Sequence, residues 1–360
     1  MHQRGRGVRA RGQLGAGAAA AGALAAAVAA AVGAAEGAPP VPVESAPRKG
    51  TPCETVTLPG GAKIDAKPGC TVSDARYSAQ VAAVVWWMPV ADDDDARSGG
   101  LVIADRSAPG APAAVRLFEE TTIPRIVDVR DVSGDGMDDV ILTTLNEADK
   151  PEDEAAEYFI YGRRRDGFGD LGTYFVLAPK WGTGEFTGIF RTLSADDDST
   201  WKFDSFRFVR VAEDEKKVDG LKATATSAMA KYPASNAVDG DYKTTWTEAR
   251  KDGGAGVKIT VTLPKKIVLG RLSFATGYDA ISPKWGDLYW LNNHVSDVTL
   301  KFDGGIEKRI PVGYGARWID YIPHEDFSTK KIVLTIDTVH RGLKWNDTCI
   351  NEIQVFERTP

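Results

Sequence analysis

Length and charge set broad limits on this chain. Its 360 residues are enough for two domains of ordinary size, each able to bury its own core. Acidic residues outnumber basic ones by 50 to 44, and the net charge of −6 argues against nucleic acid and anionic membrane surfaces as partners.

The N-terminus has the layout of a secretory signal peptide. Four arginines within the first 11 residues precede a run of Ala, Gly, Val and Leu at residues 14–33, and small residues follow at 34 and 35. A retained membrane anchor is the alternative, although Ala and Gly make the run a poor span. We expect cleavage of residues 1–35, which removes four arginines and changes the net charge from −6 to about −10. We also expect export to the periplasm, cell surface or medium, without membrane insertion.

Residues 36–74 are expected to form a flexible lead, because the first part of this segment is rich in Pro, Ala and Gly. Two of the three cysteines, Cys53 and Cys70, bracket a short turn-rich loop within it. Disulfides persist in exported proteins, so the sequence predicts a disulfide between these two cysteines.

Residues 75–212 have the pattern of a β-rich domain. Apolar residues gather in short runs that are separated by turn residues. The strands predicted in this way span residues 81–90, 101–104, 114–118, 125–129, 140–145, 158–162, 174–178 and 201–211.

A short acidic loop, residues 131–139, lies between two of these strands. Oxygen-bearing residues recur at alternate positions, and a glycine is sixth, where a calcium loop turns sharply. The loop resembles those of FG-GAP or VCBS-type β-propeller repeats. It occurs once, whereas such repeats recur every few tens of residues, so we expect one calcium turn in a compact domain. A solvated hairpin without an ion is the alternative. The expected Ca²⁺ ligands are Asp131, Ser133, Asp135, the Met137 carbonyl and Asp139.

A second domain is expected after a charged, apolar-poor linker at residues 213–221. Apolar and polar side chains then alternate, as in half-buried strands, at residues 257–263, 295–302, 317–322, 332–339 and 350–356. Short strands with Gly and Pro between them predict an antiparallel β-sandwich at residues 222–360. The predicted fold class is therefore all-β, with a C-terminal sandwich preceded by a separate β-rich domain.

The most informative motif lies at residues 232–246, Tyr-Pro-Ala-Ser-Asn-Ala-Val-Asp-Gly-Asp-Tyr-Lys-Thr-Thr-Trp. A second motif, Asp-Thr-Cys-Ile-Asn-Glu-Ile, lies near the C-terminus at residues 347–353. The first segment holds carboxylates and hydroxyl groups around a small-residue turn, and the second adds a carboxylate from the far end of the domain. Closely spaced oxygens suit a hard cation such as Ca²⁺. A loop tied to a terminal strand by an ion is a design of binding modules rather than of enzymes.

In this order and spacing, the motifs resemble the discoidin-like (factor V/VIII type C) jelly roll of many carbohydrate-binding modules. The most similar variant is the glycan-binding translocation domain of NAD glycohydrolase toxins, and the similarity covers residues 222–360. The resemblance implies a structural Ca²⁺ that clips the two ends of the domain together. A hydrogen-bonded loop without an ion is the alternative. The implied ligands are the carbonyls of Ala237 and Asp241, the Asp239 side chain, Thr244 and Glu352.

Two residues of these motifs are expected in the protein interior. The resemblance implies that Trp246 packs in the core of the sandwich rather than against a sugar. Relatives often carry a second cysteine where this chain has Thr247, so Cys349 is expected to be a buried free thiol.

The connection at residues 278–293 is rich in side chains of the kind that recognise sugars. Sugar sites combine an aromatic platform with amides and carboxylates that hold hydroxyl groups in fixed directions. The alternative is that the aromatic residues only cover an edge of the sandwich. The candidate ligand-binding residues are Tyr278, Lys284, Trp285, Asp287, Tyr289, Trp290, Asn292 and Asn293.

The sequence lacks the motifs of common enzyme classes, such as Gly-x-Ser-x-Gly, His-Glu-x-x-His or a phosphate loop. The expected function is that of an exported, non-catalytic glycan-binding protein with a calcium-stabilised module. The first alternative is a protein–protein adhesion or assembly component of the bacterial cell surface, with the aromatic segment as its interface. The second is an enzyme whose active site lies in the domain at residues 75–212.

Overall fold

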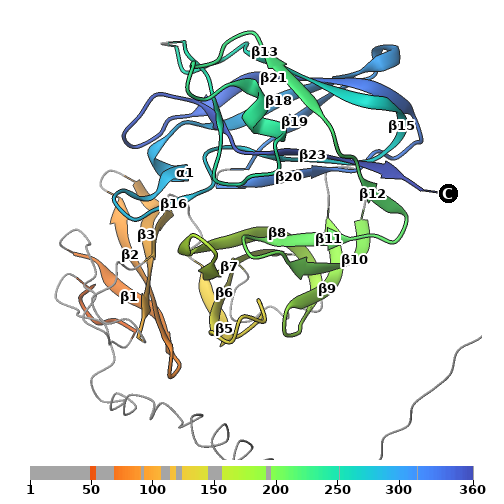
Figure 1. Ribbon diagram of the computed structural model, residues 1–360. Coiled ribbons are helices and arrows are strands. Elements are labelled where there is room, and N and C mark those ends of the chain that lie inside the picture. The colour runs from red at the N-terminus through yellow and green to blue at the C-terminus, as the bar shows by residue number, and fades with distance from the viewer. Residues whose placement is uncertain are drawn as a thin grey trace, which may run out of the picture. The chain divides into compact units, whose positions relative to one another are not determined.

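The computed structural model describes residues 49–53, 69–90, 93–106, 114–118, 124–144, 156–191, 196–250, 252–313 and 315–359, which fold largely as β-strands (Figure 1). The predicted signal peptide and most of the predicted lead lie outside these residues. Within the described part, no helix is long and apolar enough to cross a membrane. The described residues belong to one compact unit, Val41–Pro360, and form three main sheets.

The first sheet has four antiparallel strands in the order β1-β2-β3-β4. Strand β2 is covered on both faces, because Val81, Ala83 and Val85 belong to one buried cluster and Ala82 and Val84 to another. This explains why its sequence is a continuous apolar run rather than an alternating one. The strands are β1 Thr71–Tyr77, β2 Val81–Val90, β3 Asp93–Asp105 and β4 Ala114–Phe118.

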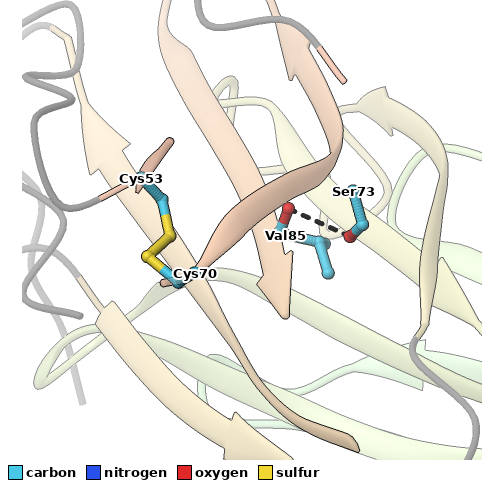
Figure 2. Close-up of a disulfide and its surroundings, with 4 residues drawn as sticks. All are labelled: Cys53, Cys70, Ser73 and Val85. Atoms are coloured by element: carbon cyan, nitrogen blue, oxygen red, sulfur yellow. Dashed lines mark hydrogen bonds between the residues drawn. A yellow bond between two sulfur atoms is a disulfide. The ribbon is translucent and has the colours of Figure 1, made fainter. Parts of the chain in front are cut away.

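A disulfide joins Cys53 to Cys70 beside this sheet (Figure 2). Both cysteines are buried in the apolar cluster on one face of β2. The Ser73 hydroxyl on β1 donates to the Val85 carbonyl on β2 at 3.0 Å, as Figure 2 shows. Because β1 begins at Thr71, the sheet starts within the segment that was predicted to be flexible up to residue 74.

The second sheet is a seven-stranded antiparallel meander in the order β11-β10-β9-β8-β7-β6-β5. Its core is aromatic, and the rings of Tyr174 and Trp201 meet edge to face with centroids 5.1 Å apart. The single strand predicted at residues 201–211 is two strands, because the Asp204 carboxylate accepts the N–H groups of Phe206 and Arg207 and makes a turn. The strands are β5 Arg125–Arg130, β6 Asp139–Thr143, β7 Ala156–Arg164, β8 Gly167–Trp181, β9 Glu185–Arg191, β10 Asp196–Phe203 and β11 Phe208–Val211.

The C-terminal sandwich is organised around one long strand, β15. The first part of β15 pairs with β13 and β21, and the second part pairs with β20 and β23. The change of partner falls between Val268, which still pairs with β21, and Leu269, which pairs with β23, so β15 contributes to both layers. Trp246 is fully buried in the sandwich core, which confirms the expectation. The main strands are β12 Glu215–Lys217, β13 Lys222–Ala225, β15 Lys258–Ala275, β18 His294–Phe302, β19 Glu307–Pro311, β20 Trp318–Tyr321, β21 Ser328–His340 and β23 Ile353–Arg358.

Short elements connect the strands of the sandwich. Four of them form two short antiparallel pairs: β14 pairs with β22, which is distant in the sequence, and β16 pairs with β17 in a hairpin. These elements are the 3-10 turns η3 Ala234–Val238 and η4 Asp303–Gly305, the strands β14 Trp246–Thr247, β16 Ile281–Ser282, β17 Gly286–Asp287 and β22 Cys349–Ile350, and the helix α1 Leu288–Leu291.

The segment predicted as a linker, residues 213–221, is part of the sandwich, because β12 pairs with β23. The buried Glu215 carboxylate forms ion pairs with Arg210 at 2.8 Å and with Arg271 at 2.9 Å. The charged residues of this segment suggested a linker, but the charge of Glu215 is neutralised by Arg271, which is distant in the sequence. The predicted fold class, all-β with a C-terminal sandwich, is confirmed.

Candidate functional site

The two motifs of the C-terminal domain lie side by side. Strands β14 and β22 pair, with Trp246 opposite Ile350 and Thr247 opposite Cys349, whose thiol is free and buried. Glu352 follows β22, and its carboxylate accepts the N–H of Gly240 at 2.9 Å. The last strand of the domain is thereby attached to the first loop.

Oxygen atoms of this loop converge on the Thr244 hydroxyl. Thr244 Oγ1 lies 2.8 Å from Asp239 Oδ2, 3.1 Å from the Asp241 carbonyl oxygen and 3.4 Å from that of Asn236. The pKa of Glu352 is raised to about 7, chiefly by burial and also by the charges of Asp239 and Asp241. A hard cation bound here would relieve this repulsion between carboxylates.

The predicted ligands of this loop fit a cation in part. Asp239, Asp241, Thr244 and Glu352 lie around one loop, and Ala237 is buried in the preceding turn η3. Within the described residues, no group of three or more His, Cys, Asp or Glu side chains is arranged to hold a metal ion. A cation here would therefore depend on carbonyl and hydroxyl oxygens, which Ca²⁺ accepts, and Ca²⁺ at this loop remains a prediction.

The acidic loop at residues 131–139 is held by its own amide groups. The Asp131 carboxylate accepts the N–H groups of Gly134 and Gly136 at 2.6 and 2.9 Å. Both glycines have positive φ angles, +78° and +85°, which other residues rarely adopt. Asp139 accepts two further N–H groups at 2.8 and 2.7 Å, and burial raises its pKa to about 7. A Ca²⁺ site remains a prediction for Asp131, Ser133, Asp135, Met137 and Asp139.

Part of the predicted sugar-binding segment is used inside the fold. Tyr289 is fully buried, and its hydroxyl is 2.9 Å from that of Thr276. Asn293 is also fully buried and donates to the side chain of Asn346 at 3.1 Å. Asn292 donates from its side chain to the Leu288 carbonyl at 2.8 Å. The structure therefore corrects the ligand-binding assignment of Tyr289, Asn292 and Asn293, because their polar groups bond within the protein.

The remaining predicted residues take other places. Asp287 caps α1 by accepting the N–H of Tyr289 at 3.1 Å, and it also forms an ion pair with the buried Arg317. Tyr278 and Trp290 are half-buried, and burial raises the pKa of Tyr278. Tyr278, Asp287 and Trp290 are thus partly covered by the protein, whereas the side chains of Lys284 and Trp285 are exposed to solvent.

Trp285 stands on an exposed aromatic and cationic surface. Its side chain is 44% exposed on the β16–β17 hairpin, and the edge of its ring meets Trp345 with centroids 5.7 Å apart. The ammonium groups of Lys344 and Lys284 lie 3.3 and 4.5 Å from the centroid of its ring. Leu343, 71% exposed, is next to Lys344 in the chain. We call these residues, Lys284, Trp285, Leu343, Lys344 and Trp345, the Trp285 patch.

The backbone of residues 343–345 of the Trp285 patch is bonded to the helix α1. The N–H of Leu343 bonds to the Trp290 carbonyl at 2.9 Å, and those of Lys344 and Trp345 bond to the Leu291 carbonyl at 3.1 and 2.8 Å. Residues 343–345 were not among the predicted ligand-binding residues. A run of Leu, Lys and Trp directly after a glycine is the signal that could have found them, since an apolar pair beside a turn is often exposed for binding.

Comparisons with known proteins agree with the fold. Residues 213–356 match the family model of the NAD glycohydrolase translocation F5/8 type C domain. This match confirms the discoidin-like resemblance of the C-terminal part, and it identifies that domain rather than the whole chain. No curated protein sequence matches the chain.

Solved structures also match about two fifths of the chain. The family 32 carbohydrate-binding module of NanJ from Clostridium perfringens, in complex with galactose, is 18% identical, with a TM-score of 0.32, and covers 40% of this chain and 99% of its own. An F5/8 type C domain from Bacteroides fragilis is 17% identical, with a TM-score of 0.32, and covers 41% of this chain and 100% of its own. The family 32 module of AlyQ, in complex with 4,5-unsaturated mannuronic acid, is 16% identical, with a TM-score of 0.29, and covers 39% of this chain and 98% of its own.

Proposed function

We propose that the protein is an exported, non-catalytic glycan-binding protein, and that the Trp285 patch is its sugar platform. The observation that carries the proposal is an exposed indole within a domain of the F5/8 type C family, in ring contact with Trp345, whose backbone N–H is bonded to α1. An indole face packs well against the C–H face of a pyranose ring. Because α1 fixes the backbone of residues 343–345, little conformational entropy of that segment would be lost on binding.

The lysines of the Trp285 patch favour glycans with acidic groups. Two ammonium groups lie within 4.5 Å of the centroid of the Trp285 ring, and the structure gives neither of them a carboxylate partner within the described residues. An acidic sugar could meet these charges while its ring packs on the indole. Binding at an exposed site of this kind should weaken as salt is added.

Calcium is a structural part of this proposal. A Ca²⁺ held by Asp239, Asp241, Thr244 and Glu352 would join the first loop to the last strand. It would stabilise the fold in proportion to its occupancy and would not itself contact the sugar.

The test is a glycan array with the full chain and two single-site variants. Trp285→Ala should lower the affinity for the bound glycan at least tenfold, which corresponds to about 1.4 kcal/mol of binding free energy. Ile189→Ala removes a similarly exposed apolar side chain on β9 and should leave binding unchanged. Glycan binding that survives Trp285→Ala would refute the assignment of the site. A folded protein that binds no glycan would favour the adhesion alternative.

A further inference from the structure

A cavity of about 270 Å³ lies where the second sheet meets the sandwich. Tyr174 on β8 and Trp201 on β10 line it from the second sheet, and Trp318 and Asp320 on β20 line it from the sandwich. Phe175 also lines it and is 40% exposed, so the cavity reaches the solvent. No residue of the Trp285 patch belongs to its lining, so the cavity is a separate place on the protein.

One side chain of this cavity, Arg207, is a buried cation without an acidic partner. Four arginines among the described residues are buried: Arg164, Arg207, Arg271 and Arg317. The other three have carboxylate oxygens within 3.2 Å, whereas Arg207 has none within 4.0 Å in the part of the chain that the structure describes.

The hydrogen bonds of Arg207 leave part of its guanidinium free. Its Nη2 donates to the Ser273 hydroxyl at 3.1 Å and to the Gln354 side-chain oxygen at 3.4 Å. Its Nε is buried and has no acceptor among the described residues. Because Arg207 is only 3% exposed, a donor without an acceptor is costly at this position. A ligand with a carboxylate group could supply the missing acidic partner of Arg207 and accept hydrogen bonds from its guanidinium.

The charge of Arg207 is retained in spite of burial. Burial lowers the pKa of Arg207, but Asp320 and other nearby acidic groups outweigh this effect and raise the pKa overall. The guanidinium carbon also lies over Trp318, 3.7 Å from the ring centroid, in the range of a cation–π interaction. This contact helps to hold the Arg207 side chain in place.

The polar tips of the aromatic residues that line the cavity are bonded within the protein. Trp201 Nε1 donates to Ser199 at 3.0 Å, and Trp318 Nε1 donates to Asp279 at 2.8 Å. The Tyr174 hydroxyl donates to the Leu171 carbonyl at 3.0 Å. The rings therefore form apolar walls beside the charged groups.

Asp320 adds a hydrogen-bond acceptor to the lining. Burial raises the pKa of Asp320, but the charges of Arg271, which is 3.2 Å away, and Arg207 outweigh burial. The pKa is therefore lowered overall, and the carboxylate is ionised. An ionised carboxylate accepts hydroxyl groups but repels a second anion. Asp170 and Asp279 also line the cavity, but both form ion pairs with Arg317, which lines it too. A ligand with a single carboxylate and several hydroxyl groups carries less negative charge than a phosphate dianion, so these carboxylates repel it less.

We propose that this cavity binds an acidic monosaccharide or a terminal acidic sugar residue. Arg207 takes its carboxylate, Asp320 accepts hydroxyl groups, and Trp201 and Tyr174 pack against its C–H groups. The volume of about 270 Å³ is just below the usual range for small-molecule sites, roughly 300–1,000 Å³, and therefore suits one sugar ring. This site is independent of the Trp285 patch, so either proposal can fail without the other.

The test is isothermal titration of the full chain with glucuronate, galacturonate and N-acetylneuraminate. Glucose and galactose serve as neutral controls, and acetate as a carboxylate without a sugar ring. At least one acidic sugar should bind, and the neutral sugars and acetate should bind at least tenfold more weakly. Equal affinity for an acidic sugar and its neutral counterpart, or for acetate, would overturn the proposal, as would the absence of binding by all three acids.

Three variants place the binding in the cavity. Arg207→Gln should lower the affinity for the acidic sugar at least tenfold. Gly313→Leu fills the cavity from its rim and should do the same, since the nearest neighbour of an added Cβ, Ala316 Cβ, is 4.0 Å away and the variant should fold. Ile189→Ala, which changes an exposed side chain on β9 outside the cavity lining, should retain the affinity. Unchanged affinity in Gly313→Leu, or loss of binding in Ile189→Ala, would overturn the assignment.

Discussion

The strongest test of the fold concerns Asp279, which joins the second sheet to the sandwich. Its Oδ1 accepts Arg164 Nη1 at 2.5 Å and Arg317 Nη1 at 2.9 Å, and its Oδ2 accepts Trp318 Nε1 at 2.8 Å. The side chain is only 4% exposed, so solvent screens these contacts little. Asp279→Asn keeps the size of the side chain and removes its charge, which leaves both arginines with fewer acidic partners.

The magnitude follows from the pKa of Asp279. Burial alone would raise this pKa, but the charges of Arg164 and Arg317 outweigh burial and lower it to about 2. A decrease of nearly two pH units from the ordinary value corresponds to about 2–3 kcal/mol of folding free energy. Removing one partner of a buried ion pair costs about 3–5 kcal/mol. We expect Asp279→Asn to lower the free energy of unfolding at pH 7 by about 2–4 kcal/mol.

The same pKa determines how stability depends on pH. Because the folded-state pKa lies below the unfolded one, the contribution of Asp279 is present above about pH 4 and is lost as the pH falls through about 2. Urea denaturation at pH 7 and at low pH therefore should show a smaller acid-induced loss in Asp279→Asn than in the wild type.

The control is an exposed ion pair. Asp326→Asn breaks the contact with Arg358, whose partner carboxylate is 63% exposed, and should change the free energy of unfolding by less than about 1 kcal/mol. If Asp279→Asn were as stable as Asp326→Asn, or lost the same stability in acid as the wild type, the reasoning about the buried ion cluster would be wrong.

Two further predictions concern Glu352 and Ser205. The pKa of Glu352 is raised to about 7, so without calcium its contribution is present below about pH 4 and is lost as the pH rises through 7. In thermal melts, Glu352→Gln should be more stable than the wild type at pH 8 in EDTA, and added Ca²⁺ should stabilise only the wild type; stabilisation of both by Ca²⁺ would exclude Glu352 as a ligand. Ser205 is exposed and has a φ of +85°, so Ser205→Gly should raise the free energy of unfolding by about 0.5–1 kcal/mol in urea denaturation. Ser205→Ala is its control, and an equal gain from Ala would show that backbone strain is not the cause.

The sequence predicted the strands of the sandwich better than its binding surface. Alternating apolar residues identify a strand and its buried face, because side chains of a strand point to opposite sides in turn. No such rule applied to residues 278–293. Tyr289 is fully buried and Trp285 is 44% exposed, although both are aromatic and only four positions apart. Tyr289 lies in the single turn of α1, which is too short to have a recognisable period, and Trp285 lies in the turn before it.

By itself, the amino-acid sequence determined the all-β class, the course of most strands and the loop at residues 232–246, because these depend on local periodicity and turn chemistry. Tertiary structure decided which polar groups are satisfied. The linker-like Glu215 is buried because Arg271, 56 residues away, pairs with it. Arg207 is bonded to Gln354, 147 residues away, and still has no acidic partner. Charge pairing over such distances depends on how sheets pack against each other, so no local pattern in the sequence records it.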